Sequence, residues 1–270
     1  MKALAAVDAW PVPTAAAAVV SPGHVETHGQ VDHRFALASV TKPLVAYAIL
    51  VGVEEGAVSL DDPAGPPGST LRHLLAHTSG YGFDLRMEAL ARPGTRRIYS
   101  NRGIDEAAAH LERAAGLPFA RYLHEAVLAP LGMTSTALEG SPAFAGVSTA
   151  EDLARFAGEL LSPRLLHPAT VADMATVQFP GLSGVLPGHG RFDPLDWGLG
   201  VEMNFGRPRH WGGTLLDRGT IGHFGASGTF LWVSRQLGLA AVGLTDRDFD
   251  DWARQAWPAF GDTLVRERTG

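Results

Sequence analysis

The chain of 270 residues contains no cysteine. This absence excludes disulfide bonds, thiolate catalysis and cysteine-ligated metal sites. Lysine is scarce as well: of the 22 basic residues only Lys2 and Lys42 are lysines, and the other 20 are arginines. An ammonium group can release its proton in a protected site, whereas a guanidinium group stays charged. The interior Lys42 is therefore a candidate proton carrier.

A long apolar run and an excess of positive charge are also missing. The apolar stretch at residues 15–20 is too short for a bilayer, which needs about 20 such residues. The net charge of −6 and the pI near 6.0 give no basic footprint for nucleic acid. Asp8, Pro11 and Pro13 make the first segment a poor secretion signal. We therefore expect no nucleic-acid or membrane partner and a cytoplasmic location.

The composition, with 46% hydrophobic and 19% charged residues, is that of an ordinary globular chain. Apolar stretches bounded by turn residues predict strands near both ends of the chain, at residues 15–20, 25–28, 199–203, 229–234 and 239–244. Helical patterns lie mainly between them, at residues 39–54, 70–77, 103–115, 118–128, 150–161 and 250–266.

Strands at both ends of the chain and helices between them predict an α+β fold. We expect one antiparallel sheet, built from both termini and flanked by helices, beside a mostly helical subdomain. The expected single domain covers residues 1–270, with a sheet lobe at about 1–60 and 195–270 and a helical lobe at about 61–194.

Ser39 stands three residues before Lys42. In a helix that begins at Ser39, a rise of about 1.5 Å per residue puts Lys42 on the same face one turn later. Pro43 fits the first turn of such a helix, because no intrahelical N–H bond is lost there. The simpler alternative is a Ser cap followed by an ordinary surface lysine.

Three short motifs occur in order: Ser39-Val40-Thr41-Lys42, Tyr99-Ser100-Asn101 and His223-Phe224-Gly225. Supporting segments are Leu-Leu-Ala-His-Thr-Ser-Gly-Tyr at 74–81 and Leu-Gly-Met at 131–133. With these motifs the chain resembles the serine β-lactamase and penicillin-binding-protein superfamily. Within it, the similarity is to the branch of class C β-lactamases, D-alanyl-D-alanine carboxypeptidases and esterases. The resemblance implies a β-lactamase/transpeptidase-like fold.

The resemblance also implies catalytic roles. Ser39 would be the nucleophile that forms an acyl-enzyme, which splits one difficult step into two. Tyr99 would be the general base or relay for the Ser39 proton, and Lys42 would supply positive charge that favours the ionised phenol. Asn101 would hold Lys42 and the substrate amide. His223 would orient the Tyr99 hydroxyl or meet a substrate carboxylate.

The same resemblance implies where substrate is held. The backbone N–H groups of Ser39 and Ala226 would form the oxyanion hole. Gly225 would let the substrate lie close against a strand, and Phe224 would be a second substrate-binding residue. No cofactor or metal is implied, and the oligomeric state is left open.

Two departures from related patterns bear on the substrate. Class A enzymes have Ser-Asp-Asn where this chain has Tyr99-Ser100-Asn101, and most class C lactamases have Lys-Thr-Gly in place of His223-Phe224-Gly225. His-x-Gly is similar to the carboxypeptidases and esterases. We therefore expect a metal-free serine hydrolase of small esters, amides or lactams, with esters favoured. The alternatives are a β-lactamase, a D-amino-acid peptidase or carboxypeptidase, and a non-catalytic binding or sensor module.

Other residues offer weaker possibilities. His73 and His77 have a zinc-compatible i, i+4 spacing, but the glutamate of a metalloprotease pair is missing, so no metal site is expected. Several aromatic residues near the C-terminal half are candidates either for pocket lining or for the core: Phe179, Phe192, Trp197, Phe205 and Trp211.

Overall fold

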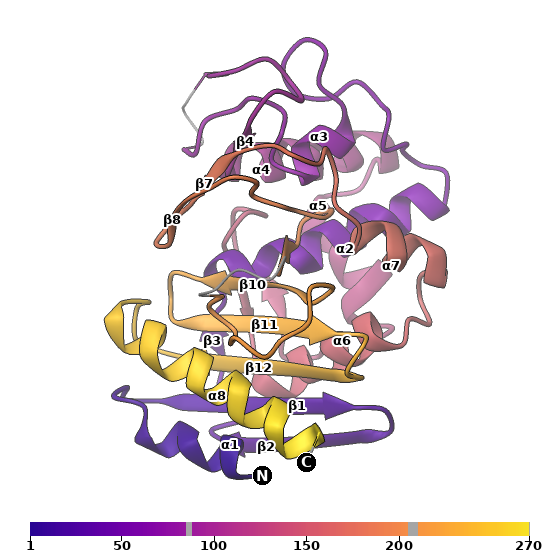
Figure 1. Cartoon of the computed structure of the whole chain (residues 1–270). Helices are drawn as coiled ribbons and strands as arrows, with labels where there is room; N and C mark the ends of the chain where they lie inside the picture. Colours follow the sequence, from indigo (N-terminus) through magenta and orange to yellow (C-terminus); the bar gives the residue numbers. More distant parts are fainter. Residues whose placement is uncertain (85–87, 205–209, 270) are drawn as a thin grey trace.

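The computed structural model describes residues 1–84, 88–204 and 210–269, and its main feature is an antiparallel sheet built from both ends of the chain (Figure 1). The strand order is β2-β1-β12-β11-β10-β9. The strands are β1 (Ala15–Ser21), β2 (His24–Gly29), β9 (Glu202–Met203), β10 (Ile221–Gly225), β11 (Thr229–Ser234) and β12 (Leu239–Thr245).

Two small three-stranded sheets lie outside the main sheet, in the orders β3-β6-β5 and β4-β7-β8. Their strands are β3 (Phe35–Ala36), β4 (Arg97–Ile98), β5 (Ala137–Leu138), β6 (Gly146–Ser148), β7 (Gly184–Leu186) and β8 (Gly190–Phe192). The pairing of β4 with β7 is parallel and joins segments that are far apart in the sequence.

The described residues also form eleven helical segments. Eight are α-helical: α1 (Lys2–Ala5), α2 (Thr41–Glu54), α3 (Leu71–Leu75), α4 (Asn101–Ala115), α5 (Phe119–Leu123), α6 (Ala150–Leu161), α7 (Pro168–Met174) and α8 (Asp251–Thr269). Three short helical turns are η1 (Ala6–Ala9), η2 (Ala38–Val40) and η3 (His124–Leu128). None of these helices in the described part of the chain is long and apolar enough to cross a membrane.

Alternate residues of a strand point to opposite faces of a sheet, and both faces of β1, β10, β11 and β12 are largely buried, whereas the edge strand β2 is mostly exposed. In β12, Ala240 and Val242 belong to the core cluster that contains α2 and α6, whereas Leu239 and Ala241 belong to an aromatic cluster under α8. Figure 1 shows α8 crossing one face of the sheet. This double burial explains why the C-terminal strands are apolar along their whole length.

The helix α2 crosses the middle of the molecule and is apolar on all sides (Figure 1). Leu44, Val45, Tyr47 and Ile49 are at most 1% exposed. A helix that is apolar on every side is normally a core helix. Lys42, in its first turn, is therefore an ionisable group at the end of an apolar helix.

The structure corrects several element boundaries expected from the sequence. Ser39 does not begin α2 but lies in the preceding turn η2, and the predicted helix at 118–128 divides into α5 and η3. No strand was predicted at His223-Phe224-Gly225, but this motif lies within β10, and α7 was not predicted either. Two glycines weaken the strand signal of β10, because glycine has low strand propensity.

Candidate active site

The segment that carries Ser39 is held between the main sheet and the β3-β6-β5 sheet. Thr229 Oγ1 on β11 donates to the carbonyl of Leu37 at 2.8 Å, and the Leu37 N–H donates to the carbonyl of Gly146 at 2.9 Å. Ala38 has a φ of 45°, which is unusual for a residue with a side chain. These contacts hold the turn in a strained conformation that leaves Ser39 partly exposed.

Lys42 is completely buried, yet each of its three N–H groups has a partner. Nζ donates to Ser39 Oγ at 3.0 Å, to Asn101 Oδ1 at 2.8 Å and to the carbonyl of Ala143 at 2.8 Å. Burial lowers the pKa of Lys42 to about 7, and the negative charge of Asp105 opposes this lowering. Lys42 can therefore exchange a proton near neutral pH.

Tyr99 lies against the same hydroxyl. Its phenol oxygen is 2.6 Å from Ser39 Oγ and 3.4 Å from His223 Nε2. Burial raises the pKa of Tyr99; the hydrogen bond with Ser39 opposes this effect, and the charge of Glu202 adds to it. The phenol is therefore neutral in the free protein. A Tyr99 general base, as predicted from the sequence, would need a lowered pKa, so the direction found in the structure is opposite to the one expected.

His223 is neutral, and its Nε2 is an acceptor that lies 3.4 Å from the Tyr99 hydroxyl, whose one proton is donated to Ser39 Oγ. Its Nδ1 lies 2.7 Å from the carbonyl oxygen of Phe224, which can only accept, so Nδ1 carries the proton and Nε2 is left to accept. Burial and, to a smaller extent, the charge of Lys42 lower the pKa of His223 to about 3. An uncharged His223 offers no permanent cation to a substrate carboxylate.

Asn101 is the first residue of α4, and Ser100 caps this helix by accepting from the N–H of Gly103 at 3.0 Å. The cap fixes where the helix begins and so brings Asn101 to Lys42. Four residues later on α4, Asp105 accepts from Ser141 Oγ and from the Ala143 N–H, at 2.7 and 2.9 Å. Asp105 thus orders the loop whose carbonyl binds Lys42.

The remaining predicted site residues lie around the end of β10. Ala226 is exposed in the turn after β10, and its N–H remains, with that of Ser39, the predicted oxyanion hole. A Cβ atom on Gly225 would overlap the carbonyl oxygen of Leu37, so this glycine allows the Ser39 segment to approach the strand. Phe224 is 8% exposed and packs with Phe249 in the aromatic cluster under α8, rather than beside Ser39.

Comparison with known proteins identifies the group to which this arrangement belongs. The model of the Beta-lactamase family matches residues 5–262. The chain belongs to the Beta-lactamase family. The predicted superfamily is thereby confirmed.

Similar proteins carry several names within this family. A crystal structure of a beta-lactamase from Mycobacterium bovis has 55% sequence identity and a TM-score of 0.97, over 99% of this chain and 100% of that one. Esterase EstB from Burkholderia gladioli is 34% identical over an alignment of 148 residues, with a coverage of 38% of this chain and 38% of EstB.

The D-alanyl-D-alanine-carboxypeptidase/endopeptidase AmpH from Escherichia coli is 27% identical over an alignment of 149 residues, with a coverage of 42% of this chain and 39% of AmpH. The matches thus span less than half the length of these two curated relatives. The M. bovis structure, which matches along the whole chain, confirms the predicted β-lactamase-like fold class.

The two histidines of α3 and its exit have separate roles in this Beta-lactamase-family chain. His73 Nδ1 accepts from the N–H of Thr70 at 3.2 Å and so caps α3. His77 is 1% exposed, and its Nδ1 accepts from the N–H of Ser100 at 3.2 Å. Within residues 1–84, 88–204 and 210–269, no group of three or more acidic or histidine side chains is placed to hold a metal ion.

The predicted aromatic candidates are dispersed. Trp197 is buried, with its ring 5.8 Å from that of Tyr99, and Trp211 belongs to the aromatic cluster under α8. Phe192 packs at the edge of that cluster, and Phe179 stacks on His73. Phe205 lies outside the described residues.

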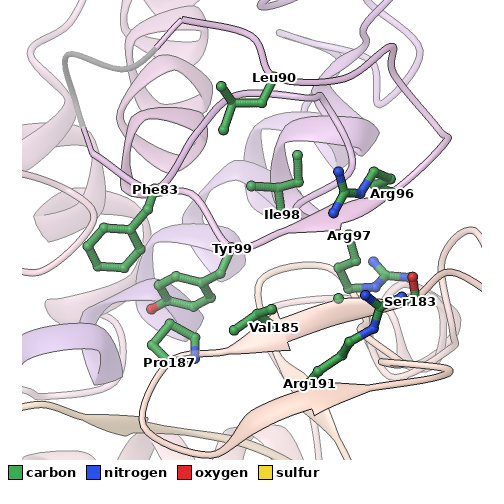
Figure 2. A pocket seen from close by; sticks show the side chains of 11 residues that line it. Phe83, Leu90, Arg96, Arg97, Ile98, Tyr99, Ser183, Val185, Pro187 and Arg191 are labelled. Atoms are coloured by element: carbon green, nitrogen blue, oxygen red, sulfur yellow. The ribbon is translucent and has the colours of Figure 1, made fainter.

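A cavity of about 480 Å³ opens beside Tyr99, and apart from Tyr99 it is lined by residues that the sequence did not single out (Figure 2). Its apolar lining residues are Phe83, Leu90, Ile98, Val185 and Pro187. They come from the loop after α3, from β4 and from the region of β7. These segments are far apart in the sequence, and only the parallel pairing of β4 with β7 brings them together in the structure. No sequence pattern therefore relates them.

Proposed function

We propose that this protein is a serine hydrolase that forms an acyl-enzyme on Ser39, needs no metal, and acts on small carboxylic esters. The observation that carries the proposal is the shared contact at Ser39 Oγ, with Lys42 Nζ at 3.0 Å and the Tyr99 hydroxyl at 2.6 Å. A base within hydrogen-bond reach, with a pKa near the working pH, is what a serine nucleophile requires.

In the first half of the reaction, neutral Lys42 accepts the Ser39 proton, directly or through the Tyr99 hydroxyl. Ser39 Oγ then attacks the ester carbonyl, and the oxyanion accepts from the N–H groups of Ser39 and Ala226. When the ester C–O bond breaks, Tyr99 donates its proton to the leaving alkoxide while it receives one from Lys42. This relay never requires a free phenolate.

In the second half, water attacks the acyl-enzyme. Tyr99 lies between Ser39 Oγ and the accepting Nε2 of His223, so the phenol can orient the water and pass its proton to Lys42. Ser39 leaves with the returned proton and the carboxylic acid is released. No other proton carrier is needed, since Lys42 begins and ends neutral.

The pH dependence tests the role of Lys42. Since only neutral Lys42 can accept a proton, kcat/KM should rise with pH through about 7 and become constant above it. Asp105→Asn removes the charge that opposes the lowering of the Lys42 pKa, so the rise should move to lower pH. Because Asp105→Asn replaces charge-assisted hydrogen bonds with neutral ones, the free energy of unfolding should fall by about 1 kcal/mol.

Glu106→Gln is the matched control for Asp105→Asn, because it removes the same charge from the next residue of α4, where Glu106 pairs with Arg113 at 3.2 Å. The pH profile of kcat/KM and the urea unfolding midpoint are measured for the three proteins. An unmoved profile in Asp105→Asn, or an equal movement in Glu106→Gln, contradicts the role given to Lys42.

The preference for esters rests on the neutral His223. A lysine at this position would bind the carboxylate of a cephalosporin, whereas a neutral imidazole binds it less well. We expect kcat/KM for short-chain p-nitrophenyl esters to exceed that for a chromogenic cephalosporin by at least about 10-fold at pH 7.5, or about 1.4 kcal/mol. His223→Lys should reduce the ratio of kcat/KM for the ester to kcat/KM for the cephalosporin.

The same comparison decides between the competing names of the relatives. The name of EstB supports an esterase, whereas that of the M. bovis protein supports a β-lactamase. Cephalosporin turnover equal to or faster than ester turnover in the wild type would overturn the ester preference. D-alanyl peptides in the same panel test the peptidase alternative, and turnover of no substrate at all would favour a non-catalytic module.

A further inference from the structure

The cavity beside Tyr99 is apolar where it is open to solvent. Seven large hydrophobic residues are exposed in the described part of the chain, and three of them line this cavity: Phe83 at 48%, Leu90 at 56% and Val185 at 55%. Phe83 also stacks on the Tyr99 ring, with 5.8 Å between the ring centres. Grouped exposed apolar side chains normally mark a surface that binds something. An apolar chain attached to the reacting carbonyl fits here.

The far end of the cavity is cationic. Figure 2 shows Arg96, Arg97 and Arg191 gathered at the end opposite Phe83 and Tyr99. No acidic side chain of the described residues lines the cavity, although the whole chain carries a net charge of −6. A local excess of positive charge on an acidic protein attracts an anion.

The two exposed arginines differ from the buried one. The Arg97 guanidinium donates to backbone carbonyls of Gln178, Phe179 and Leu195 and is thus a structural group. Arg96 and Arg191 are both exposed, and neither pairs with a carboxylate of the described residues. Their N–H groups are available to a ligand.

The strand register explains why these arginines share the apolar surface. Ile98 pairs with Val185, and Val185 pairs with Arg191, so the three side chains form one row across the small sheet. Arg96 precedes Ile98 by two residues and therefore points to the same face. From Arg96 to Tyr99 the chain advances by roughly 10 Å, since each extended residue spans about 3.3 Å.

We propose that this cavity binds an acyl chain that ends in a carboxylate, with Arg96 and Arg191 as the ligands of that carboxylate and the reacting carbonyl at Ser39. The backbone advance of roughly 10 Å from Arg96 to Tyr99 corresponds to about eight bonds of an extended chain, at ~1.2 Å each, and this length is the basis for choosing the substrates to test. The favoured substrates are thus monoesters of dicarboxylic acids of about that length. The inference rests on the proposed function and names its substrate class.

The test compares two substrates that differ only in the distal charge: the mono-p-nitrophenyl ester of octanedioic acid, and the same compound with its free carboxylate methylated. The wild type should have at least about 10-fold higher kcat/KM for the free acid, since guanidinium pairs carboxylate strongly. Arg96→Gln and Arg191→Gln should each remove most of this preference. For p-nitrophenyl butyrate, which is too short to reach the arginines, kcat/KM of both variants should stay within about twofold of the wild-type value.

Arg235→Gln is the matched control, because Arg235 is equally exposed but lies in the turn between β11 and β12. Arg235→Gln should leave kcat/KM unchanged for both octanedioate esters. Equal or faster turnover of the methylated ester by the wild type overturns the proposal. So does an equal loss for octanedioate and butyrate esters in the arginine variants, because that result indicates general damage.

A binding measurement separates this inference from the proposed function. Calorimetry with Ser39→Ala compares monomethyl octanedioate, which keeps one carboxylate, with dimethyl octanedioate. At least about 10-fold tighter binding of the monomethyl ester, lost in Ser39→Ala/Arg191→Gln, supports the carboxylate site even if no ester is hydrolysed. Equal binding of the two compounds overturns it even if ester hydrolysis is confirmed.

Discussion

Ser39→Ala should lower kcat/KM for p-nitrophenyl esters by at least about 10,000-fold, because the variant has no group that can form the acyl-enzyme. The change in stability should be small. Ser39 lies in the turn η2 and caps no helix of the described residues, and its hydroxyl oxygen accepts hydrogen bonds from Lys42 and Tyr99. We expect the unfolding free energy to change by about 1 kcal/mol, which is the cost of one lost hydrogen bond.

The measurement is steady-state hydrolysis together with urea unfolding of both proteins. A large loss of activity with an unchanged unfolding transition assigns Ser39 to the chemistry. Ester hydrolysis at the wild-type rate by Ser39→Ala would remove Ser39 from the mechanism, whereas coincident loss of activity and stability would make it structural.

Lys42→Arg should be nearly as damaging as Lys42→Ala, although arginine preserves the positive charge. The planar guanidinium cannot accept a proton from Ser39, and it is larger than the buried site that holds the ammonium. We expect less than about a tenth of wild-type kcat/KM to remain, which is a cost above roughly 1.4 kcal/mol.

Lys2→Arg is the matched control, since Lys2 is the other lysine of the chain and is exposed at α1. It should leave activity unchanged. Retention of more than about a tenth of the activity by Lys42→Arg, at pH values on both sides of 7, would show that Lys42 acts only through its charge. Circular dichroism checks that each variant is folded.

Local sequence was sufficient to predict β1, β2, β11 and β12 of the main sheet. The pair β1 and β2 was predicted because a Ser-Pro-Gly turn separates two stretches of strand-forming residues, and β11 and β12 because a turn interrupts two apolar runs. β10 was missed because its two glycines and a histidine read as a turn, whereas in the structure pairing with β11 buries all five residues.

The candidate site was partly predictable. Its motifs indicated Ser39, Lys42, Tyr99, Asn101 and His223, and the structure brings these five side chains together; their catalytic roles remain proposals. The sequence did not indicate a ligand-binding role for Arg96 or Arg191. These two residues come close together only through the register of β4, β7 and β8.

Other parts of the site had weak or no signals. Asp105 follows Asn101 by four residues on one helix face, and this spacing could have indicated it. The carbonyl of Ala143 carries no side-chain signal, because any residue type supplies the same acceptor. The direction of the Tyr99 pKa was not predictable either, since it follows from burial and not from the neighbouring Lys42 alone.

The most direct test of an acyl-enzyme on Ser39 is mass spectrometry of the protein quenched with acid during turnover of a p-nitrophenyl ester. The account predicts a mass increase equal to that of the acyl group less one hydrogen, located by peptide mapping on the segment that contains Ser39. The adduct should be absent from Ser39→Ala and should accumulate in variants with slow deacylation. An acyl group on another residue, or turnover by Ser39→Ala at the wild-type rate, would contradict it.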